Sequence, residues 1–265
     1  MFAGIGLFYL WLKGKKQKKL NKDQASKAKA MRAPISEPEE IVQCHCCSVH
    51  LPKSDGIAHD ERFYCSKEHL NQLDAQGWLG SAHWHTSPNQ DSRPENLTPD
   101  LVVIHHISLP PGGFAERSCT QFIVDFFQNK LNPSLHPYFE EIANQKVSSH
   151  FLISRDGEIL QFVSTHNKAW HAGLSSFLGR EKCNDFSIGI ELEGDGAHPF
   201  EEDQYLALAK LSAQLEAIYP NLQFVGHSDI APGRKTDPGI EFDWNKFQQK
   251  TNIPIKKLPF GLQSR

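Results

Sequence analysis

Two adjacent histidines are the first residues in this chain whose position suggests chemistry. His105 and His106 directly follow the apolar run Leu101–Ile104, which is typical of a buried strand. A histidine at the end of such a strand faces the rim of a sheet, where ligands commonly bind. Imidazole can bind a metal or carry a proton, so the pair is a candidate for ligation. The alternative is that one or both are hydrogen-bonded structural histidines.

A turn-rich loop supplies a second group of reactive side chains. It spans residues 226–239, begins at the end of a short predicted strand, and carries His227, Lys235 and Asp237. Zinc accepts histidine nitrogen and aspartate oxygen, and a catalytic zinc site uses three protein ligands and keeps one position for water. His105, His227 and Asp237 would complete such a set. The alternative is a charged loop with ordinary salt bridges.

An acidic residue on an otherwise apolar strand is the third feature. Glu191 and Glu193 lie in the segment Ser187–Glu193 and point to one face, because side chains along a strand alternate. Charge on a buried face is costly unless it is paired or used. A glutamate beside zinc-bound water could act as general base. The alternative is an edge strand whose acidic face lies in solvent.

A cysteine-rich segment could hold a second metal ion. Cys44 and Cys47 form one close pair, and Cys65 and His69 form another 17 residues further on. Two pairs of soft ligands suit a tetrahedral structural zinc, and a segment this short needs a metal to hold it together. Three nearby side chains leave the ligand identity open, namely His45, Cys46 and His50. We interpret residues 44–70 as a tethering or interaction module whose partner is unknown.

Alternating strand and helix patterns indicate how the main groups are positioned. Apolar runs predict strands, an Asp156-Gly157 turn predicts a hairpin, and two amphipathic stretches predict helices. The expected strands are 101–104, 151–153, 159–163, 187–193 and 224–225, and the expected helices are 120–131 and 203–219. We therefore predict an α/β fold with a mixed central sheet flanked by helices.

The bulk composition limits the function classes. The chain has 265 residues and a formal net charge of −3, which gives no bias toward nucleic acid. Cys119 and Cys183 stand alone, far from the four clustered cysteines. That usage fits a reducing compartment better than a disulfide framework, and we assign Cys183 a packing role.

The N-terminal segments differ from the rest of the chain. Residues 2–12 are apolar but, at ~1.5 Å per residue, reach only about half of a ~30 Å bilayer core. We interpret 1–12 as a short anchor that associates with the inner membrane, with the rest of the chain in the cytoplasm. The alternative is an apolar terminus without a membrane role. Residues 13–43, basic and then rich in Pro and Glu, are expected to form a linker.

A long series of motifs resembles the AmpD-type 1,6-anhydro-N-acetylmuramyl-L-alanine amidases of the zinc amidase and peptidoglycan-recognition-protein superfamily. The resemblance runs from Gly77 to Trp244 and implies an amidase domain over 77–258. The motifs are 77–79, 87–89, 93–94, 107–112, 136–139, 147–150, 155–159, Ala169-Trp170-His171-Ala172-Gly173, Cys183–Gly194, Gly226-His227 and Arg234-Lys235-Thr236-Asp237-Pro238-Gly239.

This resemblance implies a role for each candidate. It implies that His105, His227 and Asp237 hold zinc, and it selects His105 over His106. It further implies that Glu191 is the general base and that Lys235 stabilises the oxyanion. Positions matching substrate contacts are His106, Lys146, Trp170, Lys182 and Arg234. The family usually has Asn at 106 and Arg at 146 and 182, and lysine lacks the bidentate fork of arginine.

The implied activity is hydrolysis of the amide between (1,6-anhydro-)N-acetylmuramic acid and L-alanine in muropeptides, during peptidoglycan turnover and recycling. Two alternatives remain. A non-catalytic peptidoglycan-binding module would show a lost zinc ligand, and an envelope amidase acting on intact wall would show a cleavable signal sequence. Neither signature is convincing in this sequence.

Overall fold

The computed structural model describes residues 17–19, 21–22, 39–114 and 117–262. The chain divides into two units, 1–41 and 42–265. The predicted anchor at 2–12 lies outside the described residues, as does most of the predicted linker. In the described part, no helix has the length and apolar character needed to cross a membrane.

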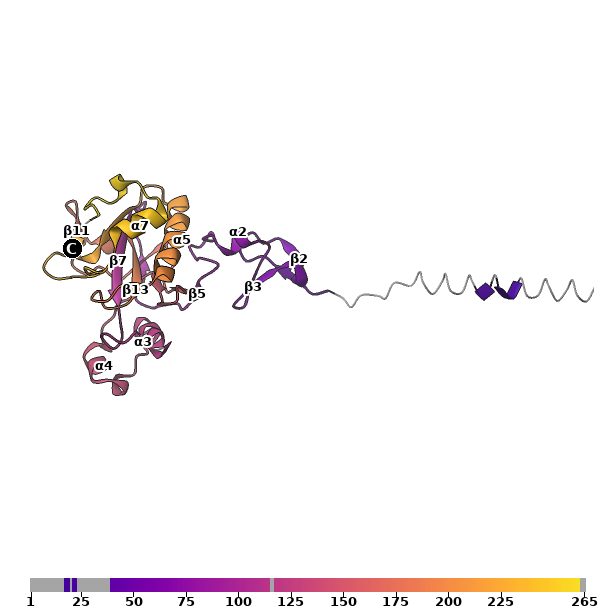
Figure 1. The fold of residues 1–265 in the computed structure, drawn as a ribbon, viewed down its shortest axis with the longest axis horizontal. Coiled ribbons are helices and arrows are strands. Elements are labelled where there is room, and N and C mark those ends of the chain that lie inside the picture. The colour runs from indigo at the N-terminus through magenta and orange to yellow at the C-terminus, as the bar shows by residue number, and fades with distance from the viewer. Residues whose placement is uncertain (1–16, 20, 23–38, 115–116, 263–265) are drawn as a thin grey trace, which may run out of the picture. The chain divides into compact units, whose positions relative to one another are not determined.

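A six-stranded sheet forms the centre of the second unit (Figure 1). Its strands, in spatial order, are β14 (Gln223–Gly226), β7 (Leu101–Ile107), β13 (Ser187–Glu193), β8 (Phe151–Ile153), β9 (Ile159–Gln161) and β5 (His83–Trp84). The first four are mutually parallel, β9 is antiparallel to β8, and β5 is parallel to β9. The predicted mixed sheet is therefore confirmed.

The described residues also form helices and smaller strand pairs. The helices are α2 (Lys67–Leu70), α3 (Arg117–Phe127), α4 (Pro137–Ile142), α5 (Glu202–Ile218), α6 (His227–Ile230) and α7 (Trp244–Thr251). The paired short strands are β1 (Ile41–Gln43) with β2 (His50–Pro52), β3 (Ile57–His59) with β4 (Arg62–Tyr64), β6 (Gln90–Ser92) with β10 (Asn167–Ala169), and β11 (Ser176–Phe177) with β12 (Arg180–Glu181).

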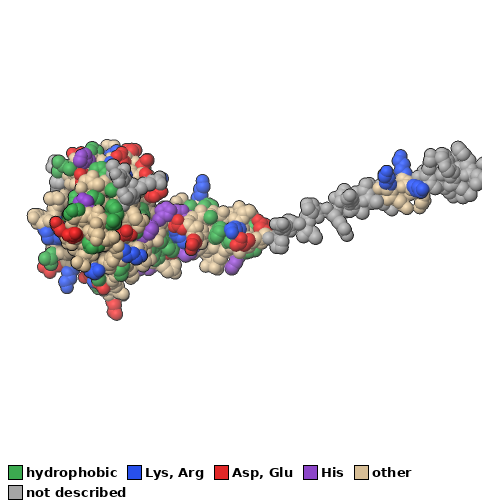
Figure 2. Space-filling view, turned by 90° about the horizontal axis from the view of Figure 1, so that it is seen from below, with side chains coloured by type: hydrophobic (Ala, Val, Ile, Leu, Met, Phe, Trp, Pro, Cys, Tyr) green, Lys and Arg blue, Asp and Glu red, His purple; other side chains and the backbone are tan. Residues whose placement is uncertain are grey.

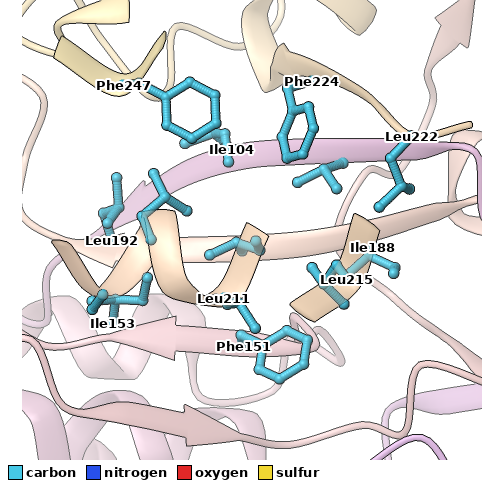
Figure 3. Close-up of a cluster of buried hydrophobic side chains, with 14 of the residues drawn as sticks. Ile104, Phe151, Ile153, Ile188, Leu192, Leu211, Leu215, Leu222, Phe224 and Phe247 are labelled. Carbon is cyan, nitrogen blue, oxygen red and sulfur yellow. The ribbon is translucent and has the colours of Figure 1, made fainter. Parts of the chain in front are cut away.

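Because side chains alternate along β7 and β13, one face of the sheet packs in an apolar cluster and the other carries His105 and Glu191. Ile104 and Ile188 pack with residues of α5 and α7, including Leu211 and Phe247, in one buried cluster (Figure 3). Residues of opposite parity, such as Val103, belong to a different cluster. Both strands read as nearly continuous apolar runs because both of their faces are covered.

The structure corrects several sequence predictions. β7 continues through His105 to Ile107, because its ladder with β13 extends that far, so His105 lies within the strand. The strand carrying Glu191 is central, so the edge-strand alternative is wrong. α3 covers 117–127 instead of 120–131, and Asn129 beyond it adopts a left-handed backbone conformation that ends helices.

The Cys/His segment contacts the edge of the sheet next to β5. The Arg62 guanidinium lies 3.6 Å from the centre of the Trp84 ring and donates to the Ala82 carbonyl at 2.9 Å. The Tyr64 hydroxyl donates to the Gly80 carbonyl at 3.3 Å.

On the visible face of the protein, acidic and basic side chains are interspersed (Figure 2). Because residues 71–96 supply β5 and β6, this stretch does more than connect the two predicted domains.

Candidate active site

Three neighbouring strands carry the candidate groups to one end of the sheet. His105 lies near the end of β7, and Glu191 lies opposite it on β13. His227 begins α6 directly after β14. Lys235 and Asp237 come from the loop that follows α6. The carboxyl ends of parallel strands meet at one edge, so residues far apart in the chain become neighbours here.

A close backbone approach fixes the loop that carries Asp237. The Ser228 amide donates to the Asp237 carbonyl at 2.9 Å. A Cβ atom at Gly226 would lie 2.7 Å from the Pro238 ring, which no real side chain tolerates. Glycine at 226 therefore allows the loop to fold back against the end of β14.

The three predicted zinc ligands converge on one point. His105 Nδ1 lies 2.8 Å from Asp237 Oδ2, and His227 Nδ1 lies 3.0 Å from the same oxygen. The exposed fractions of these three residues are 2%, 8% and 2% for His105, Asp237 and His227. The potential ligand atoms of all three lie within 4.8 Å of one another.

The hydrogen bonds around this cluster show that it suits a cation. His227 Nε2 lies 3.0 Å from the Ala172 carbonyl, which can only accept, so this nitrogen carries a proton. With that proton on Nε2, Nδ1 is the atom of His227 that can act as a metal ligand beside Asp237. Burial raises the pKa of Asp237, but hydrogen bonds and positive charge from the two imidazoles lower it far below its usual value, so the carboxyl is ionised, and a cation bound between these atoms would act in the same direction. Acceptor atoms facing one another fit a bound cation.

The electrostatics of His105 point the same way. Burial, assisted by the nearby His227 ring, lowers the pKa of His105 to about 4. The ring is therefore neutral near pH 7 and has a lone pair to offer. Two imidazoles and one carboxylate form the nitrogen and oxygen donor set that catalytic zinc uses.

Glu191 has the environment of a general base. Its Oε2 atom is buried and accepts no hydrogen bond from any residue the structure describes. Burial raises the pKa of Glu191 well above the usual value, the Asp237 carboxylate raises it further, and Lys235 opposes the change. A carboxylate in this state holds a proton readily, which general acid–base catalysis near neutral pH requires.

An open cavity of about 470 Å³ joins these groups. His105, Glu191, His227, Lys235 and Asp237 all line it. This volume is within the range of small-molecule sites. The structure therefore brings all five predicted residues together around one cavity. Their individual roles stay predictions.

The predicted substrate contacts are placed less uniformly. His106, Trp170 and Arg234 line the cavity. Lys182 is exposed and lines a neighbouring cavity together with Arg234, and Lys146 is exposed and lines neither. The Arg234 guanidinium already donates to the Ala172 carbonyl at 2.7 Å and to the Leu174 carbonyl at 2.6 Å, so part of its hydrogen-bonding capacity holds the loop in place.

His171 is a site residue that the sequence prediction did not single out. Its Nδ1 lies 2.9 Å from His105 Nε2, behind the metal cluster, and it also lines the cavity. Burial lowers the pKa of His171 well below its usual value. In the sequence it appears only inside the motif from Ala169 to Gly173, where nothing about its spacing marks it as a neighbour of His105.

The four predicted zinc ligands of the cysteine-rich segment 44–70 also lie together. Cys47 Sγ and Cys65 Sγ are 3.8 Å apart, which matches the edge of a tetrahedron with Zn–S bonds of about 2.3 Å. His69 Nδ1 lies 3.0 Å from Cys65 Sγ and 3.7 Å from Cys44 Sγ. Cys46 lies outside the cluster and accepts a hydrogen bond from Gln72.

Comparisons with known proteins agree with this geometry. Residues 95–240 match the model of a family described as N-acetylmuramoyl-L-alanine amidase (Amidase_2). The 1,6-anhydro-N-acetylmuramyl-L-alanine amidase AmpD of Escherichia coli (strain K12) is 50% identical over 175 residues, covering 65% of this chain and 93% of that protein. The protein of the same name from Haemophilus influenzae is 48% identical over 175 residues, with the same coverage.

A solved structure supports the similarity in three dimensions. The crystal structure of a selenomethionine AmpD derivative has a TM-score of 0.63 and 48% sequence identity to this chain. The similarity covers 66% of this chain and 97% of the other. About a third of this chain lies outside the match.

Proposed function

The chain belongs to the N-acetylmuramoyl-L-alanine amidase family, and we propose that it hydrolyses the amide bond between 1,6-anhydro-N-acetylmuramic acid and L-alanine in muropeptides. It is a hydrolase of peptidoglycan turnover and recycling. The observation that carries this proposal is the convergence of His105, His227 and Asp237 beside Glu191 in one open cavity.

We assign His105, His227 and Asp237 as the ligands of a catalytic zinc ion. The support is the donor set of two imidazoles and one carboxylate, with the far nitrogen of each ring making a second hydrogen bond. A zinc ion bound there supplies Lewis acidity, which polarises the scissile carbonyl and activates water as a nucleophile.

Glu191 transfers the proton in this reaction, and Lys235 stabilises the developing negative charge. Glu191 accepts the proton of the attacking water and then delivers it to the nitrogen of the departing L-alanine. Lys235 lines the same cavity and stabilises the negative charge that develops on the carbonyl oxygen, an effect typically of several kcal/mol. Cys183 is buried in an apolar cluster and takes no part, and burial raises the pKa of its thiol.

His106, Trp170 and Arg234 are the substrate contacts that the cavity favours. Trp170 donates from its indole nitrogen to Asp91 at 2.8 Å, and this bond orients the ring at the cavity wall, where it can pack against a sugar or peptide. Arg234 presents positive charge to a peptide carboxylate. The exposed lysines at 146 and 182 lie outside this cavity, and contact with substrate through them is a weaker expectation.

We further propose a structural zinc ion held by Cys44, Cys47, Cys65 and His69. Their separations support it. Burial acts to raise the pKa of Cys44, but backbone donors and the His69 ring bring it down to about 6. Burial and the neighbouring thiols raise the pKa of Cys65 to about 11. Full ionisation of this thiol cluster therefore needs a cation.

The site of action is a separate expectation. We expect a cytoplasmic enzyme, since no disulfide joins the cysteines that the structure describes, although several lie close together. Association of residues 2–12 with the inner membrane stays a prediction. Fractionation of the native protein between membrane and soluble pools tests both expectations.

Hydrolysis of anhydro-muramyl tripeptide, with and without chelator, tests the proposed activity. We expect release of the tripeptide by the zinc-loaded protein, loss of release after verified metal removal, and recovery on adding zinc. Full activity in metal-free protein would contradict the mechanism. Cleavage of intact sacculi with no cleavage of the soluble substrate would instead indicate an envelope amidase, and binding without cleavage of either would indicate a recognition module.

A further inference from the structure

A chain of hydrogen bonds runs from His105 away from the cavity into the protein interior. His105 Nε2 lies 2.9 Å from His171 Nδ1, and His171 Nε2 lies 3.0 Å from Ser187 Oγ. Ser187 Oγ lies 2.6 Å from the Cys183 carbonyl oxygen. All of the side chains in this series are at least largely buried, and Ser187 is fully buried.

The Cys183 carbonyl, at the end of this series, determines the positions of the protons on Ser187, His171 and His105. A carbonyl oxygen cannot donate, so a separation of 2.6 Å requires the Ser187 hydroxyl proton to point at Cys183. The Ser187 oxygen can then only accept from His171, which places the proton of that neutral ring on Nε2. His171 Nδ1 is left with a lone pair, and it accepts a proton from His105 Nε2.

One atom remains after this assignment. When His105 donates its ring proton from Nε2 to His171, Nδ1 is the nitrogen left to bind a metal, and Nδ1 is the atom that faces Asp237 at 2.8 Å. The hydrogen bonds thus select the tautomer that can bind a metal on the cavity side. The alternative tautomer would place a proton between His105 and Asp237, where it would compete with the metal ion.

Close packing keeps His171 in the position that this chain needs. Its ring lies against Gly189 of β13, where a Cβ atom would come within 2.6 Å of the ring. Any side chain at 189 would push the ring away from His105 and Ser187. The glycine in the middle of the apolar strand is therefore explained by the histidine that lies on it.

We propose that Ser187 and His171 are positioning residues that set the tautomer of His105 through the Cys183 carbonyl, before the metal binds. This inference rests on the proposed zinc site and deepens it. Outer hydrogen-bond partners of metal-bound histidines typically contribute 10- to 100-fold in metal affinity. Ser187 does not line the cavity, and His171, which does, contacts His105 directly, so we assign both a role through His105.

Long-range ¹H–¹⁵N spectra of the histidine rings in the full chain test the proposal directly. We expect His171 to be neutral and protonated on Nε2 in both the zinc-loaded and the metal-free protein. A proton on Nδ1 of His171, or a doubly protonated ring, overturns the proposal. This measurement needs no activity, so it distinguishes failure of the proposed hydrogen-bond chain from failure of the proposed function.

A variant tests the consequence for metal binding. Ser187→Ala removes the acceptor of the His171 proton, and we expect the zinc dissociation constant of the catalytic site to rise at least about 10-fold. Ser149→Ala is the matched control, because Ser149 is also buried and donates to a backbone carbonyl at 2.7 Å, but has no contact with His171 in the structure. Equal zinc affinity in the two variants overturns the proposal. If Ser187→Ala does not fold, the histidine spectra of the wild-type protein alone test the proposal.

Discussion

Glu191 on β13 lies directly opposite His105 on β7 in a parallel ladder, so the candidate base and a candidate metal ligand are held side by side by the backbone. Both strands are central and covered on both faces, which makes them poor places for polar side chains. His105 and Glu191 line the cavity, where a cation and a substrate would satisfy them.

Substitution of His227 separates the two proposed metal sites. In His227→Ala the catalytic site loses one of three ligands, and we expect activity to fall by roughly three orders of magnitude, since a metal contributes several kcal/mol of transition-state stabilisation. Zinc content measured by mass spectrometry should fall from two ions to one per chain. Retention of two ions would show that His227 does not hold the metal.

Replacing the candidate base should affect chemistry without affecting metal binding. Glu191→Gln keeps the shape of the side chain but cannot take a proton, so we expect kcat to fall about 10²- to 10⁴-fold. Zinc content serves as the control and should be unchanged, because Glu191 is not a proposed ligand. A variant that keeps most of its kcat would remove Glu191 from the mechanism.

The pH profile should carry the signature of the same residue. Only the ionised form of Glu191 can accept a proton, and burial raises its pKa, so activity should fall with decreasing pH before the ordinary glutamate pKa of about 4.3 is reached. The residual activity of Glu191→Gln should lack this acid limb. An identical limb in both proteins, with zinc still bound, would assign it to another group.

Glu193 gives a prediction about stability. Burial raises the pKa of Glu193, although Thr120 and the Arg155 amide donate to Oε2; among the described residues, none donates to Oε1. The folded state therefore holds this proton to higher pH than the unfolded state, and stability falls as pH rises from the ordinary pKa through the raised one. Denaturant unfolding should show that Glu193→Gln gains stability relative to wild type over that range. A constant difference across pH would contradict this account.

The structural zinc site can be tested without disturbing the cavity. Cys65→Ser should lose the proposed second zinc ion and lower the unfolding temperature, because a segment as short as 44–70 needs a metal to hold it together. Among the residues that line the described cavity, none comes from 44–70, so activity per catalytic zinc should stay the same. Loss of activity with the catalytic zinc still bound would assign the segment a role in catalysis.

The sequence allowed prediction of those site residues whose type is unusual for their place. An acid on an apolar strand and a histidine pair at the end of another are such signals, and the mixed sheet followed from strand and helix periodicity. The ligand choice between His105 and His106 needed the family resemblance, because alternation along β7 cannot say which face becomes the cavity.

Other features depend on contacts between distant segments. His171 lies in a loop whose hydrogen-bond partners, His105 and Ser187, lie on two different strands. Strands as short as β5 have no periodicity to detect. Lys146 illustrates the opposite case, since its match to a substrate-contact position of the family indicated a role, but the structure leaves it exposed outside the cavity.

Anomalous diffraction at the zinc absorption edge tests the central claim most directly. The account predicts a peak about 2.0 to 2.2 Å from His105 Nδ1, His227 Nδ1 and Asp237, with one coordination position open toward Glu191. A fully zinc-loaded crystal with no peak at that point, or with a peak bound by other side chains, would contradict it.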